Sequence, residues 1–312
     1  MKIKTVLAAA ALSAAVVSGS ALAETVVGVT WFAKSSMAER ILQGMQERNE
    51  ELGNPITLKI DHTKKDNEEA RARTQQFLNE GVNGVAVLRS AGGTLMKEMG
   101  LPVPGFIGAH NHPERVGSIE NMDAPEGNIT GVTYFLPYKV QLDTFRNIAN
   151  KMDRVGILTE EGHPAAPVTE AGVMAYCKEN GMTCMHKSVS DIPSLVAAVE
   201  EMDSQVDAFV LGNQRDVYDQ TPTIAEHTDK PLFSFSKKGA ELGALAAFAA
   251  DDNKLGRYLT DSIVDVLING KAVKDVPVKT DEDPVLYVNM TTAGKLGVEV
   301  PYEILSTATI IE

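Results

Sequence analysis

The sequence predicts an α/β protein with two Rossmann-like lobes, each built on a parallel sheet with helices on both faces. Short apolar, β-branched runs alternate with segments whose apolar residues recur at helical spacing. The turn-rich stretch PEGNITGVTY, residues 125–134, interrupts this alternation, which then restarts. A chain of 312 residues is also long for a single domain and sufficient for two.

Four strand-like runs make up the first set of elements. They cover residues 25–32, 56–60, 84–88 and 103–108. Ser36 and Glu39 have the spacing of a capping box and predict the start of the first helix. Asp66 and Gly81 are expected to start and end a helix over 67–80. Residues 91–100, with two adjacent glycines, predict only a short helix.

The second set repeats the same order. Strands are expected at 154–159, 183–189, 206–212 and 231–235, and helices at 139–152, 167–181, 192–202 and 217–228. Residues 243–250 fit either a strand or a helix of small residues. Asp251 or Asp252 is then expected to cap a helix that Gly270 ends.

The first 23 residues predict a signal peptide. Lys2 and Lys4 precede an apolar run too short to span a bilayer, and Ala21-Leu22-Ala23 fits a cleavage site. We expect cleavage after Ala23 and export, and no membrane insertion of the remaining chain, which has no run of 18 apolar residues. Loss of the two lysines takes the net charge from −13 to −15, so nucleic acid is a poor partner.

Cys177 and Cys184 are the two cysteines of the chain. In an exported protein they can pair, one near a helix end and the other in the next strand. Two buried thiols are the alternative, and we favour a structural disulfide. The spacing fits neither a redox C-x-x-C motif nor a zinc site.

Candidate binding residues follow from the topology, because ligands of open α/β sheets lie beyond the carboxyl ends of the strands. The junctions there carry aromatic, amide and charged side chains, which suit a small polar ligand with an apolar part. The candidates are Trp31, Phe32, Ser35, Ser36, Arg89, Ser90, Glu160, Asn213, Gln214, Arg215, Ser236 and Asp251. For each a structural role is the alternative: Ser36 as a helix cap, or Trp31 in the core.

Catalytic and cofactor motifs are missing from the sequence: there is no G-x-S-x-G, H-E-x-x-H, Walker or G-x-G-x-x-G pattern. His110 and His112 could supply two metal ligands, but no third is evident nearby. Glu160 with Glu161 could supply a general base, yet no nucleophile accompanies them. We therefore expect a protein without metal, cofactor or enzymatic activity.

Four segments resemble a known family. They are GNITGVTYFLP (127–137), VDAFVLGNQRD (206–216), GRYLTDSIVDVLINGKAVKDVPV (256–278) and LYVNMTTAGKLGVEVPYEIL (286–305). They are similar to the ABC-transporter substrate-binding proteins of the tryptophan and tyrosine type, which are type I periplasmic binding proteins. The resemblance extends over nearly the whole mature chain.

The resemblance implies a monomeric periplasmic receptor that closes two lobes around a ligand and docks on an inner-membrane ABC permease. It implies lobes of 24–132 with about 251–282, and 133–250 with about 283–312, joined by a multi-strand hinge, and it adds Tyr134 and Phe135 to the site. The loops at 31–36, 89–93 and 112–113 depart from the family pattern. An aromatic or apolar amino acid, or a related carboxylate, is the first expected ligand.

In that assignment Trp31 and Phe32 supply apolar surface, Arg89 or Arg215 meets a carboxylate, and Glu160 or Asp251 meets an amine. A sugar ligand stays open, because aromatic, amide and arginine side chains also suit sugars. Two other functions stay open as well: a ligand sensor that partners a chemoreceptor or kinase, and a secreted α/β hydrolase.

Overall fold

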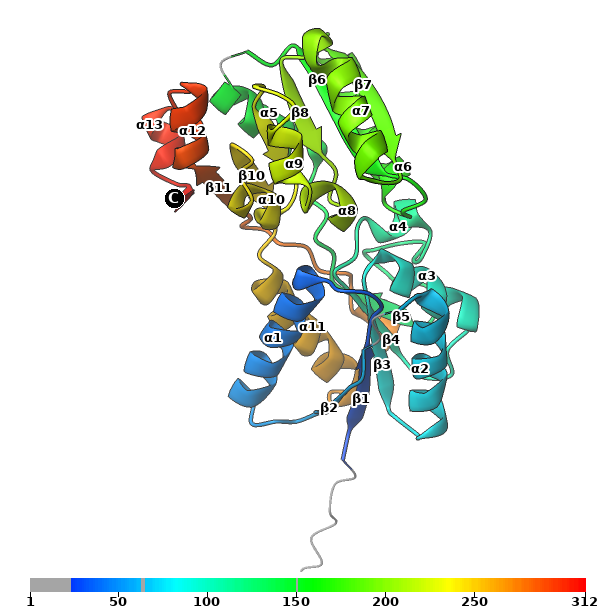
Figure 1. The fold of residues 1–312 in the computed structure, drawn as a ribbon. Coiled ribbons are helices and arrows are strands. Elements are labelled where there is room, and N and C mark those ends of the chain that lie inside the picture. The colour runs from blue at the N-terminus through cyan, green and yellow to red at the C-terminus, as the bar shows by residue number, and fades with distance from the viewer. Residues whose placement is uncertain (1–23, 63–64, 150) are drawn as a thin grey trace, which may run out of the picture.

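The protein consists of two α/β lobes, one above the other in Figure 1. The computed structural model describes residues 24–62, 65–149 and 151–312. The predicted signal peptide therefore lies outside the described residues. Among those described, no helix is long and apolar enough to cross a membrane.

Lobe 1 contains a five-stranded, fully parallel sheet in the order β2-β1-β3-β4-β5. The strands are β1 (Val26–Thr30), β2 (Thr57–Ile60), β3 (Gly84–Leu88), β4 (Gly105–Gly108) and β5 (Ile129–Gly131). The helices are α1 (Ser36–Glu51), α2 (Asn67–Asn79), α3 (Ser90–Met99), α4 (Pro113–Val116) and α11 (Asp252–Leu267). Strands β3 and β4 are buried along their whole length, as expected where helices cover both faces.

Helix α11 comes from the far end of the chain and packs directly on α1 (Figure 1). Two glycines allow the close approach. A Cβ at Gly44 would lie 2.0 Å from the Asn253 carbonyl oxygen, and one at Gly256 would lie 2.1 Å from the Ile41 carbonyl oxygen. Both distances are far below van der Waals contact, so this helix pair depends on glycine at these positions.

Lobe 2 contains a seven-stranded sheet in the order β12-β11-β10-β9-β8-β6-β7. The strands are β6 (Arg154–Glu160), β7 (Thr183–Val189), β8 (Ala208–Leu211), β9 (Leu232–Ser234), β10 (Ala246–Ala249), β11 (Val285–Asn289) and β12 (Thr309–Ile311). The helices are α5 (Tyr138–Ala149), α6 (Ala166–Glu179), α7 (Ile192–Met202), α8 (Arg215–Tyr218), α9 (Thr221–Ala225), α10 (Lys237–Glu241), α12 (Met290–Leu296) and α13 (Tyr302–Leu305).

One strand pair breaks the parallel pattern that the sequence predicts. Strand β11 runs antiparallel to β10, while the other pairs of the sheet are parallel. The reason is the route of the chain. Strand β10 runs towards lobe 1 and continues into α11, and β11 starts from the same side when the chain returns. The segment 243–250, which fits either a strand or a helix from its sequence, contains β10.

The start of α1 also differs from the prediction. Ser35, not Ser36, is the N-cap, and its hydroxyl oxygen accepts a hydrogen bond from the Ala38 amide at 3.2 Å. The predicted caps Asp66 and Asp251 are both present at the starts of α2 and α11. Helix α3 starts at Ser90 and spans 10 residues, which is longer than the glycine pair suggests.

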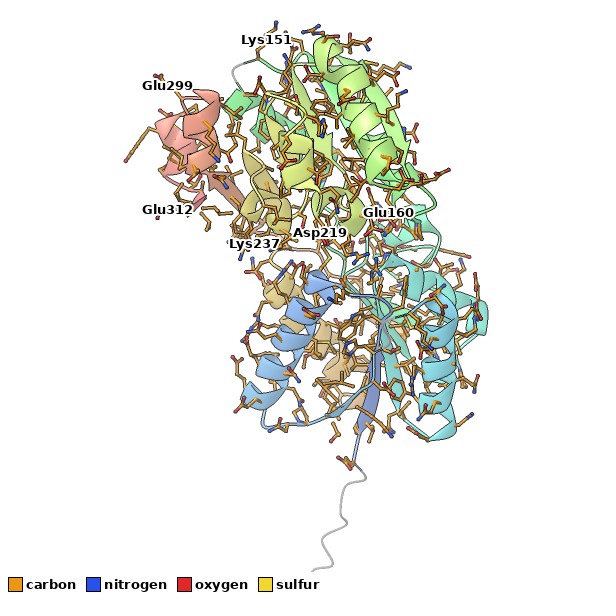
Figure 2. All side chains as sticks on the ribbon, viewed as in Figure 1. Lys151, Glu160, Asp219, Lys237, Glu299 and Glu312 are labelled. Carbon is orange, nitrogen blue, oxygen red and sulfur yellow. A yellow bond between two sulfur atoms is a disulfide. The ribbon has the colours of Figure 1, made fainter. Side chains whose placement is uncertain are left out.

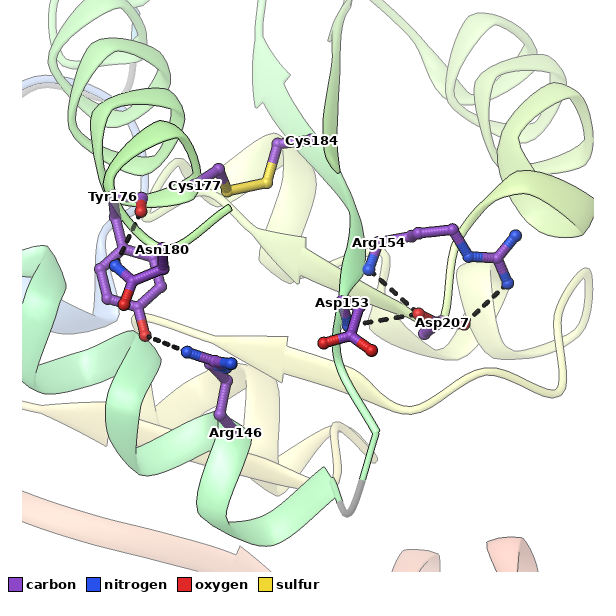
Figure 3. Close-up of a disulfide and its surroundings, with 8 residues drawn as sticks. All are labelled: Arg146, Asp153, Arg154, Tyr176, Cys177, Asn180, Cys184 and Asp207. Atoms are coloured by element: carbon purple, nitrogen blue, oxygen red, sulfur yellow. Dashed lines mark hydrogen bonds and ion pairs between the residues drawn. A yellow bond between two sulfur atoms is a disulfide. The ribbon is translucent and has the colours of Figure 1, made fainter. Parts of the chain in front are cut away.

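A disulfide joins Cys177 of α6 to Cys184 of β7, with their Cα atoms 6.2 Å apart (Figure 3). Beside it, the Tyr176 hydroxyl accepts a hydrogen bond from Arg146 of α5. The disulfide links helix α6 to the edge strand β7 of the sheet. It therefore fixes an edge of lobe 2 that lies away from the contact with lobe 1.

Candidate functional site

The carboxyl ends of β1, β3 and β4 in lobe 1 face those of β6 and β8 in lobe 2. Two hollows lie between the lobes there, with cavity volumes of about 30 Å³ and about 20 Å³. The first is lined by Ser35, Met37, Arg89, Ser90, Ala109, Tyr134, His163, Asn213, Arg215 and Tyr218. The second is lined by Asn111, Tyr134, Phe135, Leu136, Tyr138, Gln141, Thr169, Asn213 and Phe235.

Tyr134 and Asn213 line both hollows and so join them into one site. The first hollow is bordered by arginine, histidine and hydroxyl groups, whereas the second has an aromatic wall. In that wall the rings of Phe135 and Tyr138, and those of Tyr138 and Phe235, meet edge to face with centroids 5.4 Å apart. The site thus has a polar end and an aromatic end.

Arg89 dominates the polar end. It follows β3, and its backbone has φ 73° and ψ 159°, a conformation that is almost confined to glycine. Its Nη1 donates to the Phe32 carbonyl oxygen at 3.1 Å, and its guanidinium carbon lies 4.6 Å from the centre of the Phe32 ring. In the described chain the guanidinium forms no ion pair, and burial lowers its pKa.

Three side chains of lobe 2 lie close enough to Arg89 to influence its pKa electrostatically: Glu160, Arg215 and Tyr218. Burial raises the pKa of Glu160, nearby Asp216 raises it further, and Arg89 opposes the shift. One oxygen of Glu160, Oε2, is buried without a hydrogen-bond partner in the described part of the protein, as is Oδ1 of Asn213. Of these two lobe 2 acceptors, Asn213 lines both hollows, whereas Glu160 lines neither and lies near Arg89. Figure 2 shows Glu160, Asp219 and Lys237 along this edge of lobe 2.

His163 also faces the polar end. Burial, together with the positive charge of Arg89, lowers the pKa of His163 to about 4. The imidazole is therefore neutral at physiological pH and adds a polar group without charge. Burial likewise raises the pKa of Tyr218 to about 12, so its hydroxyl stays protonated.

The structure brings seven of the predicted residues to the wall of the site: Ser35, Arg89, Ser90, Tyr134, Phe135, Asn213 and Arg215. Others have structural contacts. Phe32 lies beneath the Arg89 guanidinium. Gln214 is fully buried and donates to Thr169. Asp251 and Ser236 precede α11 and α10, where Asp251 accepts from the helix amides, and Ser36 is the first residue of α1.

Trp31 lies in the core of lobe 1 and does not line either hollow. Its side chain is 1% exposed and packs with Val27 and Val29. The alternation of β1 explains this position, because residues two apart in a strand face the same side. The His62 ring stacks on the Trp31 ring with centroids 4.2 Å apart. A ligand contact by Trp31 stays a prediction that this placement does not support.

The histidine pair of the β4–α4 loop does not form a metal site. His110 is fully buried, its Nδ1 lies 2.6 Å from the Asn111 carbonyl oxygen, and its Nε2 lies 3.0 Å from the Ser118 hydroxyl. Both ring nitrogens are thus used within the protein. Across the described residues, no group of three or more histidine, cysteine or acidic side chains could hold a metal ion.

Sequence reasoning missed several lining residues: Met37, Ala109, Tyr138, Gln141, His163, Thr169 and Tyr218. Most of them lie within one helical turn of a strand-to-helix junction. His163 follows Glu160 by three residues, and Tyr218, the last residue of α8, follows Arg215 by three residues. Including the first helical turn after each junction among the candidates would have found these residues. Periodicity alone, however, does not indicate which face of a helix meets the other lobe.

Two α/β lobes whose sheets face each other across a shared set of polar and aromatic side chains have the type I periplasmic binding fold of solute-binding proteins. The chain belongs to the family of ABC transporter substrate binding proteins, whose model matches residues 26–311. This is a family of solute-binding proteins and not of enzymes.

Individual relatives are distant in sequence. A tyrosine-binding protein of Clostridioides difficile is 17% identical over 261 residues, which cover 83% of this chain and 75% of the relative. A Streptococcus pneumonia ABC domain in complex with L-Trp superposes with a TM-score of 0.83 at 21% identity, covering 93% of this chain and all of that one. The ligand-free, open structure of a substrate binding protein with adhesive properties from Clostridium difficile gives 0.77 at 19% identity, with 92% and 99% covered.

Proposed function

We propose that this chain is an exported receptor that binds a small carboxylate between its lobes and delivers it to an inner-membrane ABC permease. An aromatic or apolar amino acid is the first candidate. The observation that carries the proposal is Arg89, a half-buried cation with a strained backbone that forms no ion pair in the described chain. Such a group is stabilised when a ligand brings a carboxylate to it.

The rest of the site fits a ligand with two different ends. Glu160 and Asn213 of lobe 2 offer unpaired acceptors, which suit an ammonium group. The wall of Phe135, Tyr138 and Phe235 suits an aromatic or apolar side chain. The names of two relatives, one tyrosine-binding and one solved with L-Trp, support the same choice.

Binding requires the lobes to move apart and close again. A hollow needs about 10–15 Å³ to hold one water molecule, so volumes of 20 and 30 Å³ hold no amino acid. A ligand that contacts both Arg89 and Asn213 favours the closed arrangement, because it bridges the lobes only there. The closed form is then the state that docks on the permease.

We propose binding without turnover. Three side chains of lobe 2, Thr159, His186 and Glu170, are arranged like the nucleophile, base and orienting carboxylate of a catalytic triad. The Thr159 hydroxyl lies 2.8 Å from His186 Nε2, and His186 Nδ1 lies 3.2 Å from Glu170 Oε1. Thr159 is fully buried, however, so its hydroxyl does not reach a substrate. These side chains instead connect β6, β7 and α6.

The test is mass spectrometry of small molecules released from freshly purified protein, followed by calorimetry with L-tyrosine, L-tryptophan and L-leucine. We expect one carboxylate to bind with one-to-one stoichiometry and to be recovered unchanged after long incubation. A bound sugar, or no heat with any carboxylate, would reject the carboxylate assignment. Conversion of the ligand would reject a pure receptor.

A further inference from the structure

Asp281 is a buried carboxylate in the segment that leads from lobe 1 back to lobe 2. Its side chain is fully buried. Its Oδ2 accepts a hydrogen bond from the Asp251 amide at 2.8 Å, and its Oδ1 accepts from the Asp283 amide at 3.0 Å and from Lys254 Nζ at 2.8 Å. One carboxylate thus joins two segments that cross between the lobes to helix α11 of lobe 1.

The chain crosses between the lobes three times: between β5 and α5, between β10 and α11, and between residue 279 and β11. Asp251 lies in the second crossing, whereas Asp281 and Asp283 lie in the third. Lys254 Nζ also donates to the Asp283 carbonyl oxygen at 2.8 Å. The lobe 1 end of the second crossing is therefore held at Asp251, and the lobe 1 end of the third crossing is held at Asp281 and Asp283.

The first crossing is attached to lobe 1 in a different way. The Thr133 amide donates to the Lys279 carbonyl oxygen at 3.0 Å, and the Tyr134 amide donates to the His110 carbonyl oxygen at 3.0 Å. The Thr133 hydroxyl donates to the His110 carbonyl oxygen at 2.8 Å. On the other side, the Gln141 side chain of lobe 2 donates to the Leu136 carbonyl oxygen at 2.9 Å.

We propose that Asp281 is a positioning residue of the hinge, which holds the second and third crossings on lobe 1. Lobe motion then bends the chain at 135–137, 249–250 and 284–285, and lobe 2 rotates while lobe 1 keeps the crossings. This inference rests on the lobe motion in the proposed function. Asp281 touches no residue that lines the two hollows through any hydrogen bond in the described structure.

A carboxylate is required because three donors converge on two oxygens. Asparagine offers one acceptor oxygen and turns an NH₂ group towards either the Asp251 amide or Lys254. At least one of these partly buried hydrogen bonds to residue 281 is then lost, and the two crossings are held together less firmly. Each crossing can then bend at a different place, which widens the range of lobe orientations.

The test is the distribution of distances between the lobes, measured by electron paramagnetic resonance without ligand. Spin labels are attached to cysteines introduced at two exposed alanines, Ala72 of α2 and Ala197 of α7. Asp281→Asn is compared with Asp261→Asn. The latter removes an equivalent charge from α11, where Asp261 accepts from Arg48 on the side that faces α1.

We expect a broader distribution in Asp281→Asn than in the parent protein, and an unchanged one in Asp261→Asn. If Asp281→Asn does not fold, Lys254→Met replaces it with the same expected broadening. A distribution as narrow as that of Asp261→Asn overturns the proposal, even if the melting temperature falls. Because no ligand is added, a failure to bind any carboxylate leaves this result interpretable.

Discussion

Replacing Arg89 with glycine separates ligand binding from stability. In the folded state the change removes strain of about 1–3 kcal/mol, because Arg89 has a backbone conformation that favours glycine. It also removes the hydrogen bond to the Phe32 carbonyl oxygen, about 1 kcal/mol, and adds unfolded-chain entropy of about 0.5–1 kcal/mol. These effects nearly cancel, so we expect stability to stay within about 1 kcal/mol of the parent.

Ligand affinity should respond very differently to Arg89→Gly. A hydrogen bond to a charged group contributes about 1.5–3 kcal/mol. Since 1.4 kcal/mol corresponds to a factor of ten, the dissociation constant should rise about 10- to 150-fold. Arg89→Lys should have an intermediate effect, because it keeps the charge but not the planar pair of donors.

The assay is titration calorimetry with the compound that mass spectrometry identifies, alongside urea denaturation of each variant. Arg71→Met is the matched control, since Arg71 pairs with Glu98 on the outer surface of lobe 1. The reasoning is refuted if Arg89→Gly binds as tightly as the parent. It is also refuted if affinity falls only together with a loss of stability of several kcal/mol.

Three further outcomes are expected. Trp31→Ala should lower the unfolding free energy by about 3–5 kcal/mol, because the side chain lies in the core and is 1% exposed. A weaker ligand affinity at unchanged stability would instead place Trp31 in the site. Burial raises the pKa of Asp252 to about 6 despite its ion pair with Arg40, whereas the unfolded value is about 3.9. The proton therefore stabilises the folded state below pH 4, and this contribution is lost as the pH rises through 6. Relative to Asp252→Asn, the parent should lose about 2–3 kcal/mol between pH 4 and 7 in denaturant titrations, and parallel curves would contradict this. Replacing Cys177 and Cys184 by serine should lower the unfolding free energy by about 2.5 kcal/mol, because the disulfide closes a loop with a sequence separation of 7 and so limits the entropy of the unfolded chain. Ligand affinity should not change. Reduction of the disulfide in the parent protein should cause the same loss of stability in a thermal scan.

The alternation of apolar runs predicted β1 to β4 and β6 to β9, because a strand buried on both faces has a continuous apolar sequence. It left β10 undecided and did not predict β11 or β12. The local sequence pattern did not indicate that β11 would pair antiparallel with β10, because the direction of β11 depends on how the chain returns from lobe 1. The helix 252–267 was predicted correctly as a helix. Its partner α1, more than 200 residues away, follows only from the glycine contacts in three dimensions.

The site was predictable where a residue follows a strand directly, as for Arg89, Ser90 and Asn213. Trp31 shows why the same rule fails elsewhere. The last residue of a strand and the one after it point to opposite faces, so one of them can remain in the core. The strained backbone of Arg89 has no signature in composition or periodicity, because arginine is not a residue expected at such an angle.

The pairing of α1 with α11 has a consequence for the synthesis of the chain. Lobe 1 lacks one wall of its core until residue 267 has emerged, and lobe 2 lacks β11 and β12 until residue 311. Neither half of the polypeptide has a complete fold of its own while the ribosome is still adding residues. A chain built in this order completes both cores only near the end of translation, which would favour the export that we propose.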